Sequence, residues 1–126
     1  MLIPHLHFDG NCMEAIHLYE KAFNTKVDTE SIDYMSDGKK IAHAIMKIHG
    51  IKVFINDAQE FLKDTLGVNC SAHLIITFKS IAELLDCYEI LKSDDKISPF
   101  FETQYSKMTG NFKDKFGVLW GFMVTD

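Results

Sequence analysis

The chain has 126 residues, of which 47% are hydrophobic and 25% charged, and this predicts one compact domain or two half-domains sharing a core. The net charge of −5 and the scattered Lys and Arg residues argue against nucleic-acid binding, which needs clustered basic side chains. No apolar run approaches the roughly 18 residues of a membrane span, and the N-terminal residues lack the features of a signal peptide. We therefore expect a cytoplasmic protein whose three cysteines are reduced thiols.

Near the N-terminus, the pattern predicts a strand followed by a helix. His5 and His7 alternate with apolar residues, so they share one face of the strand. After a polar break, the periodicity predicts a helix over 12–23. Asn11 is its expected N-cap, and Glu14 stands where it completes a capping box.

Three further strands complete the first half of the chain. We expect a weak strand over 25–35 and a strong one over 41–48, with His43 on the face opposite to its alanines. A tight turn then leads into a strand over 51–56, which pairs with 41–48 as a hairpin. The order is strand, helix, strand, strand, strand, and a short helix over 58–64 is an option after it.

The second half repeats this order. His73 lies on one face of its first strand, and Ser80 caps the following helix, with Glu83 in capping-box position. Further strands are expected near 97–103, 105–113 and 118–124.

The two halves are also similar in sequence. HLHFDGNCMEAIHLYEKAF at 5–23 is echoed by HLIITFKSIAELLDCYEILK at 73–92, and each half ends in a Gly-led apolar strand. A repeat of this length predicts two copies of one supersecondary unit, with His5 and His73 at equivalent positions. We therefore expect an α+β protein with two βαβββ modules in tandem. The expected bounds are 1–62 for the first module, 63–70 for a connector and 71–126 for the second module, in one structural domain overall.

The motifs FDGNCMEAIHLYEKAF, HAIMKI and FKDKFGVLWGF resemble the PhnB-like branch of the vicinal-oxygen-chelate superfamily. That superfamily also holds glyoxalase I, bleomycin-resistance proteins and extradiol dioxygenases, and sequences of this branch often bear the label of a demethylubiquinone methyltransferase. The resemblance covers nearly the whole chain. It implies the glyoxalase/bleomycin-resistance-like fold, with mixed sheets that curve around a cleft, and a homodimer.

Histidines dominate the candidate ligand site. If the helices cover the apolar faces of the two first strands, the opposite faces line the cleft. The candidate cleft residues are His5, His7, His43, His73, Glu102 and Trp120. A histidine can act as acid or base near neutral pH, and an aromatic lining suits a flat or apolar ligand. Hydrogen-bonded scaffold histidines and core aromatics are the alternative explanation.

The resemblance also raises the question of a metal. In metal-dependent relatives the cleft holds a divalent ion between histidines and glutamates, which implies His5 and His73 as ligands of Zn, Ni, Fe or Mn. The two acidic places match no carboxylate, because one falls on Gly121 and the other near Ile55 or Asn56. A transition-metal site needs about three or four protein ligands, so a metal-free site is favoured.

Two functions therefore stay open, and no catalytic residue is assigned. The first is binding of a small organic ligand in a cleft lined by His and aromatic residues. The second is a metal-dependent lyase, isomerase or dioxygenase of the glyoxalase type. Methyl transfer is not expected, because the seven glycines are isolated and form no nucleotide-binding loop. A purely structural protein is disfavoured, because that role explains no histidine-rich face. Whether the cleft forms within one chain or across a dimer stays open.

Overall fold

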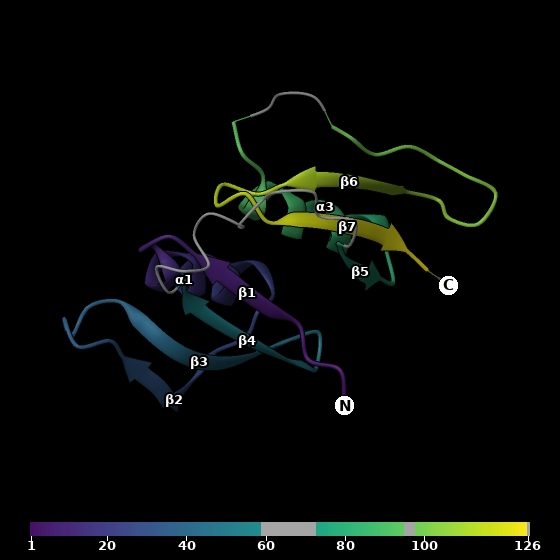
Figure 1. The fold of residues 1–126 in the computed structure, drawn as a ribbon. Helices are drawn as coiled ribbons and strands as arrows, with labels where there is room; N and C mark the ends of the chain where they lie inside the picture. Colours follow the sequence, from purple (N-terminus) through teal and green to yellow (C-terminus); the bar gives the residue numbers. More distant parts are fainter. Residues whose placement is uncertain (59–72, 95–97, 126) are drawn as a thin grey trace. The chain divides into compact units, whose positions relative to one another are not determined.

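The structure is a computed structural model that describes residues 1–58, 73–94 and 98–125. The chain divides into two compact units, Met1–Val68 and Asn69–Asp126 (Figure 1). In the described residues, each unit has one helix and its own mixed sheet, so the predicted α+β class with two modules is confirmed. The predicted connector at 63–70 lies outside the described residues, and so does the optional helix over 58–64 except for residue 58. The module boundaries stay a prediction.

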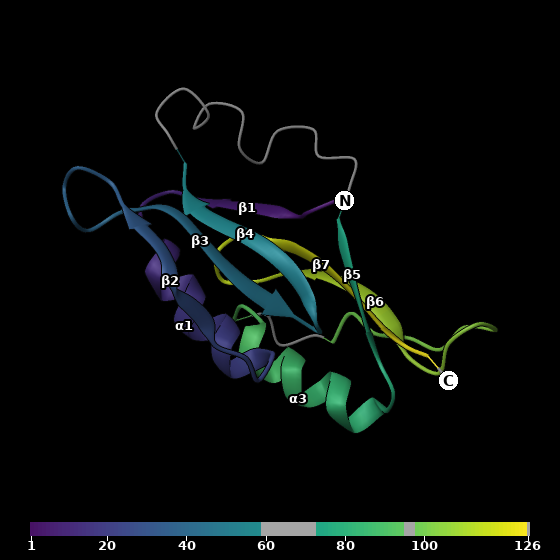
Figure 2. The same cartoon turned by 90° about the horizontal axis from the view of Figure 1, so that it is seen from below.

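A four-stranded sheet forms the first unit, in the order β1-β4-β3-β2. The strands are β1 (His5–Phe8), β2 (Val27–Tyr34), β3 (Ile41–Ile48) and β4 (Ile51–Asp57), and the helix is α1 (Cys12–Ala22). β1 runs parallel to β4, and the remaining neighbours are antiparallel. Figure 2 shows α1 along one face of this sheet. The predicted strands and helix of this half are confirmed within a few residues.

The core of the first unit lies between α1 and the sheet. The ring of Tyr19 packs between Phe8 and Phe23, at centroid distances of 6.1 and 6.0 Å. The other fully buried apolar residues are Cys12, Ala15, Ile16, Ile41, Ala44, Met46 and Ile55. Burying one large apolar side chain contributes about 1.5–3 kcal/mol, so this face fixes the pairing of helix and sheet.

A buried carboxylate, and not Asn11, holds the start of α1. Asp57 is only 2% exposed, and its Oδ1 accepts a hydrogen bond from the backbone N–H of Cys12 at 3.0 Å. Its Oδ2 accepts from the backbone N–H of Ile41 at 2.8 Å. Asn11 makes no side-chain capping bond, so the predicted capping box at Asn11 and Glu14 is wrong. Asp57 thereby ties the first residue of α1 to the first residue of β3.

The second unit has a three-stranded sheet in the order β5-β7-β6, with β5 parallel to β7. The elements are β5 (Leu74–Phe78), α3 (Ile81–Leu91), β6 (Thr109–Lys113) and β7 (Leu119–Val124). The hydroxyl of Ser80 accepts from the backbone N–H of Glu83 at 3.2 Å, which confirms the predicted cap. Neither α1 nor α3, the helices of the described residues, is long and apolar enough to cross a membrane.

The strand predicted near 97–103 is wrong for the part that the structure describes. From residue 98 onward the segment makes one bridge, between Phe101 and Thr109, and the strand predicted over 105–113 is confirmed only over β6. Pro99 has no N–H to donate to a ladder, which weakens strand formation here. A Cβ on Gly110 would lie 2.5 Å from the Pro99 carbonyl oxygen. The segment therefore lies close against β6 without becoming a full strand.

Aromatic rings fill the core of the second unit. The Tyr88 ring of α3 meets Phe100 and Phe112 edge-on, each at 4.9 Å between centroids. Phe122 in turn lies 4.8 Å from Phe112 and 4.8 Å from Phe78. Edge-to-face pairs of this kind stabilise a core beyond their buried area. One tyrosine of the helix thus anchors the residues on both sides of the loop that precedes β6.

Candidate functional site

Three histidines of the first unit gather on the face of its sheet that is turned away from α1. His5 and His7 come from β1, and His43 comes from β3. β4 runs between these strands, and its register sets Phe54 beside His5 and Asn56 beside His7. The apolar residues that alternate with them face α1, because side chains alternate along a strand. We call His5, His7, His43, Phe54 and Asn56 the histidine cluster.

The rings of the histidine cluster contact one another. The imidazoles of His5 and His7 lie 4.1 Å apart between centroids, at an interplanar angle of 36°. The edge of His43 meets Phe54 at 4.8 Å, and His5 meets the same phenyl ring at 5.9 Å. Phe54 therefore lies between imidazoles from the two strands that flank β4.

Asn56 joins two of the imidazoles. Its Oδ1 lies 2.8 Å from Nδ1 of His7, and it also forms a side-chain hydrogen bond with His5. The Asn56 side chain is buried, with 7% of its surface exposed. Sequence reasoning considered Asn56 only as a poor metal ligand and overlooked Phe54. The alternation of side chains along β4 was the signal that connects both residues to one face.

The histidine cluster disfavours positive charge on His5. Burial lowers the pKa of His5 below its usual value of 6.5, and the charges of His7 and His43 lower it further. The hydrogen bond with Asn56 opposes this shift. His5 is therefore neutral at physiological pH, and its imidazole carries an unprotonated nitrogen.

The structure aligns the two units differently from the sequence echo. The carbonyl of Phe8 accepts a hydrogen bond from the residue after β4 at 2.6 Å, and the carbonyl of Phe78 accepts from the residue after β7 at 2.8 Å. Matching these two carbonyls makes His5 equivalent to Ile75 and not to His73. The prediction that His5 and His73 are equivalent is therefore wrong. A shift of two residues keeps every side chain on its face, so the sequence pattern did not reveal it.

In the second unit, a glycine makes room for His73. Gly121 is the fourth residue after Gly117, the positive-φ glycine that precedes β7. Phe54 is likewise the fourth residue after Gly50, the positive-φ glycine that precedes β4. A Cβ on Gly121 would lie 2.9 Å from Nε2 of His73 and 2.9 Å from Oδ1 of Asn111. The space that the Phe54 ring takes in the first unit is therefore occupied here by His73 and Asn111.

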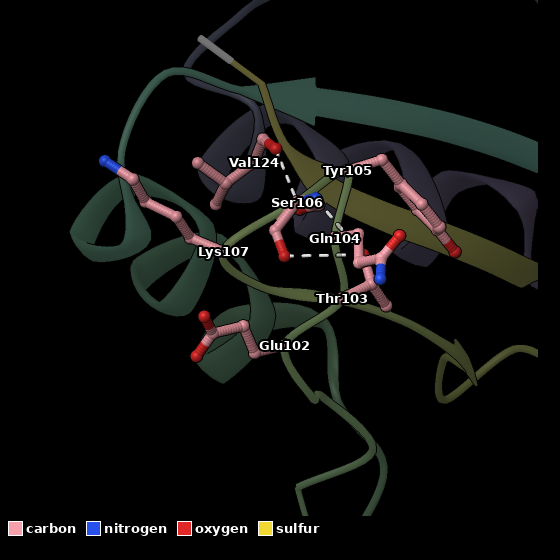
Figure 3. Close-up of a pocket in the computed structure, with 7 residues that line it drawn as sticks. All are labelled: Glu102, Thr103, Gln104, Tyr105, Ser106, Lys107 and Val124. Carbon is pink, nitrogen blue, oxygen red and sulfur yellow. Dashed lines mark hydrogen bonds between the residues drawn. The ribbon is translucent and has the colours of Figure 1, made fainter.

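The remaining two candidates lie elsewhere in the second unit. Glu102 lines a hollow of about 250 Å³ in the loop before β6, together with residues 103–107 and Val124 (Figure 3). The Ser106 hydroxyl donates to the Val124 carbonyl at 2.8 Å and closes one side of it. Trp120 is fully buried, and its Nε1–H donates to Asp114 at 2.9 Å. The expectation that Trp120 faces a ligand is therefore corrected, because its ring is a core residue.

The described residues do not fit the implied metal. A transition-metal site needs about three or four protein ligands, and the described residues contain no group of three or more His, Cys, Asp or Glu side chains that is placed to hold an ion. His5 and His73, the expected pair, hold non-equivalent positions in their sheets. His7 is engaged with Asn56 through Nδ1. No metal ligand is therefore assigned.

Two of the three thiols lie in the described residues, and both are protected. Cys12 and Cys87 are buried, and burial raises the pKa of each to about 12. For Cys12, burial is the larger cause of this pKa and the carboxylate of Asp57 contributes the rest. A nucleophilic cysteine needs a thiolate, so neither thiol is a candidate nucleophile.

Comparisons with known proteins agree with this architecture. The chain is 26% identical over 137 residues to protein YjdN of Escherichia coli K12, which covers 94% of this chain and 91% of that protein. It superposes on a PhnB protein from Bacillus cereus with a TM-score of 0.77, at 21% identity and 98% coverage of both chains. A glyoxylase/bleomycin resistance protein/dioxygenase domain from Frankia gives a TM-score of 0.71, at 14% identity and with 100% and 91% of the two chains covered.

The sequence profile of one family covers almost the whole chain. Residues 1–123 match the family described as 3-demethylubiquinone-9 3-methyltransferase, which is the label expected for this branch. The solved structures add the paired-module fold of the glyoxalase and bleomycin-resistance proteins. This protein therefore belongs to the 3-demethylubiquinone-9 3-methyltransferase family, and it shares its fold with a PhnB protein and with a glyoxylase/bleomycin resistance protein/dioxygenase domain.

Proposed function

We propose that this protein binds a small organic ligand at the histidine cluster and is not a methyltransferase. One observation carries the proposal, namely that three imidazoles, one phenyl ring and one buried amide converge on a single face of a sheet. Small-molecule sites typically combine apolar and aromatic surface with a few well-placed polar groups. The histidine cluster has this composition.

The position of the cluster in the sheet suits ligand recognition. Strands β1, β4 and β3 lie side by side and hold the five side chains on regular backbone. A site built on strands loses little conformational entropy when a ligand arrives. Ile45 stands opposite Phe54 in the register and extends the apolar part of the same face. The cluster thus offers a flat apolar centre with imidazoles on both sides.

The loops of the chain support the exclusion of methyl transfer. A nucleotide-type cofactor site commonly uses a Gly-rich loop between a parallel strand and the next helix. Among the described residues, β1 and β5 are the parallel-paired strands that lead into a helix, and only residues 9–11 and 79–80 separate them from α1 and α3. These two connections contain one glycine, Gly10. Neither can wrap a nucleotide phosphate or sugar with its backbone.

A fragment screen by NMR tests the proposal. Uniformly labelled full-length protein is titrated with a library of small organic molecules while the side-chain resonances of the cluster are followed. We expect binders that shift His5, His7, His43 and Phe54 together, with affinity at least about tenfold weaker in His43→Ala, a loss of about 1.4 kcal/mol.

The matched control is His17→Ala, which removes an exposed histidine of α1 outside the cluster. This variant should bind with unchanged affinity. Fragments that bind but leave the cluster resonances in place, or that lose affinity equally in both variants, would overturn the proposal.

A further inference from the structure

We infer that Asn56 fixes the tautomer of His7, so that the histidine cluster recognises a ligand group that donates a hydrogen bond, such as a hydroxyl or an N–H. The ligand part of this inference rests on the proposed function. The tautomer part is a property of the free protein and is tested without any ligand.

The hydrogen bond between the two side chains assigns the proton. Oδ1 of Asn56 lies 2.8 Å from Nδ1 of His7. A carboxamide oxygen only accepts, so Nδ1 of His7 must carry the hydrogen. A neutral imidazole has a single N–H, which leaves Nε2 with a lone pair. That nitrogen is therefore an acceptor and fits a partner that donates.

Asn56 is held firmly enough to impose this choice. The side chain is buried, and its backbone lies in the ladder between β1 and β3. The next residue, Asp57, is also buried and bonds to the backbone of Cys12 and Ile41. The amide group is thus fixed on both sides, in the way that an outer residue orients a metal-bound histidine and sets its tautomer.

The second imidazole supports the same ligand class. His5 also hydrogen-bonds with Asn56, and its ring lies 4.1 Å from that of His7. Burial lowers the pKa of His5, which keeps this neighbour neutral at physiological pH. The unprotonated nitrogen of His5 therefore adds a second lone pair beside Nε2 of His7. A hydroxylated or N–H-bearing ring laid on Phe54 therefore suits the cluster better than an anion.

The first test reads the tautomer directly. Full-length protein with ¹⁵N-labelled histidine is examined at pH 8 by long-range ¹H–¹⁵N correlation. We expect a protonated Nδ1 and an unprotonated Nε2 for His7. Asn56→Leu removes the acceptor and should return His7 to the mixture of an unconstrained histidine, whereas Asn56→Asp keeps an accepting oxygen and should retain the wild-type pattern. His17 serves as the internal reference, because it lies outside the cluster.

Two results would overturn the inference. One is a protonated Nε2 in the wild-type protein, and the other is an unchanged His7 tautomer in a folded Asn56→Leu variant. If that variant does not fold, the wild-type and Asn56→Asp spectra still decide, because each must show the hydrogen on Nδ1.

The second test uses three probes with the same ring, namely phenol, anisole and benzoate. Phenol donates a hydrogen bond, whereas anisole and benzoate at pH 8 only accept. We expect phenol to shift the resonances of His7 and Phe54 at concentrations several-fold lower than the other two probes, with the preference lost in Asn56→Leu. Equal or tighter binding of anisole or benzoate at the cluster would refute the donor preference while leaving ligand binding intact. A fragment screen without any binder at the cluster would instead defeat the proposed function and leave the tautomer result standing.

Discussion

His5 makes the stability of the first unit sensitive to acid. Its pKa in the folded protein lies below 6.5, because burial and the charges of His7 and His43 disfavour the protonated ring. In the unfolded chain the same ring titrates near ~6.5. Between these two pKa values the unfolded state binds more protons than the folded state, so stability falls as the pH falls through this window.

We therefore expect wild-type protein to lose stability relative to His5→Gln when the pH is lowered from 7 to 5. Denaturant unfolding at each pH measures the difference, and above pH 7 the two curves should keep a constant separation. The effect is modest, since most of the His5 side chain is exposed and solvent screens its charge. A stability difference that stays constant over the whole range would contradict the assignment. The other titratable groups on this face of the sheet are His7, Asp28, Asp33, His43, Lys47 and Lys52.

The two buried thiols should resist modification. Burial raises the pKa of Cys12 and of Cys87 to about 12, so almost no thiolate is present at pH 8. We expect iodoacetamide to leave both residues unmodified in native protein and to label both in denaturant. Peptide mass spectrometry resolves the two sites. Rapid labelling of either cysteine in the native state would show that its helix opens locally.

At the scale of elements, Asp57 is the residue that connects α1 with β3. Asp57→Ala leaves two buried backbone donors, those of Cys12 and Ile41, without their acceptor. An unsatisfied buried donor costs about 1–3 kcal/mol, so we expect a loss of about 2–5 kcal/mol in the free energy of unfolding. Asn11→Ala is the matched control and should cost less than about 0.5 kcal/mol, because Asn11 makes no capping bond. Equal costs in urea unfolding would show that Asn11 is the true cap.

Two buried glycines of the second unit lie against different kinds of neighbour, Gly110 against backbone and Gly121 against side chains. In Gly110→Ala the new methyl group would meet the Pro99 carbonyl at 2.5 Å, and backbone cannot move away without breaking the contact with β6. We expect a loss of about 1–3 kcal/mol. In Gly121→Ala the neighbours are the ends of His73 and Asn111, which can rotate, so the loss should stay under about 1 kcal/mol.

The NMR resonances of His73 provide a second comparison of the two variants. Gly121→Ala should shift the ring resonances of His73, whereas Gly110→Ala should leave them unchanged. Thermal unfolding gives the stability difference. If Gly121→Ala proves the more destabilising variant, His73 is held more rigidly than its flexible side chain implies.

Local sequence patterns predicted the helices and strands, but they did not predict contacts between residues that are far apart in the sequence. The alternation around His43 and the cap at Ser80 are signals within a few residues, and both are confirmed. The bond from Cys12 to Asp57 spans 45 residues, and no local pattern points to it. The place of Asn56 beside His7 depends on the parallel register of β1 and β4, which the sequence leaves open.

Over the whole molecule, the two units share a plan but differ in what their sheets carry. The first unit gathers three histidines around Phe54, whereas the second has Gly121 at the equivalent place and a core of aromatic rings. The sequence therefore predicted the duplication correctly but not the division of roles. A ligand set repeated in both units would need His5 and His73 at equivalent strand positions. The two positions differ by two residues along the strand, so the repeated set is not formed. The expected homodimer and cytoplasmic location stay predictions.

The family description makes one last prediction necessary. A 3-demethylubiquinone methyltransferase must bind S-adenosylmethionine, which needs a pocket for a nucleoside and a loop for its sugar. In the described residues, β1 passes into α1 through three residues and β5 into α3 through two, and each connection is too short for such a loop. We expect no heat of binding for S-adenosylmethionine by isothermal titration calorimetry, at protein concentrations that detect a millimolar Kd. We also expect no methyl transfer to a demethylated quinol in the presence of that cofactor. Stoichiometric binding of S-adenosylmethionine would mean that the family description applies literally, and competition of the cofactor with phenol would then locate it at the histidine cluster.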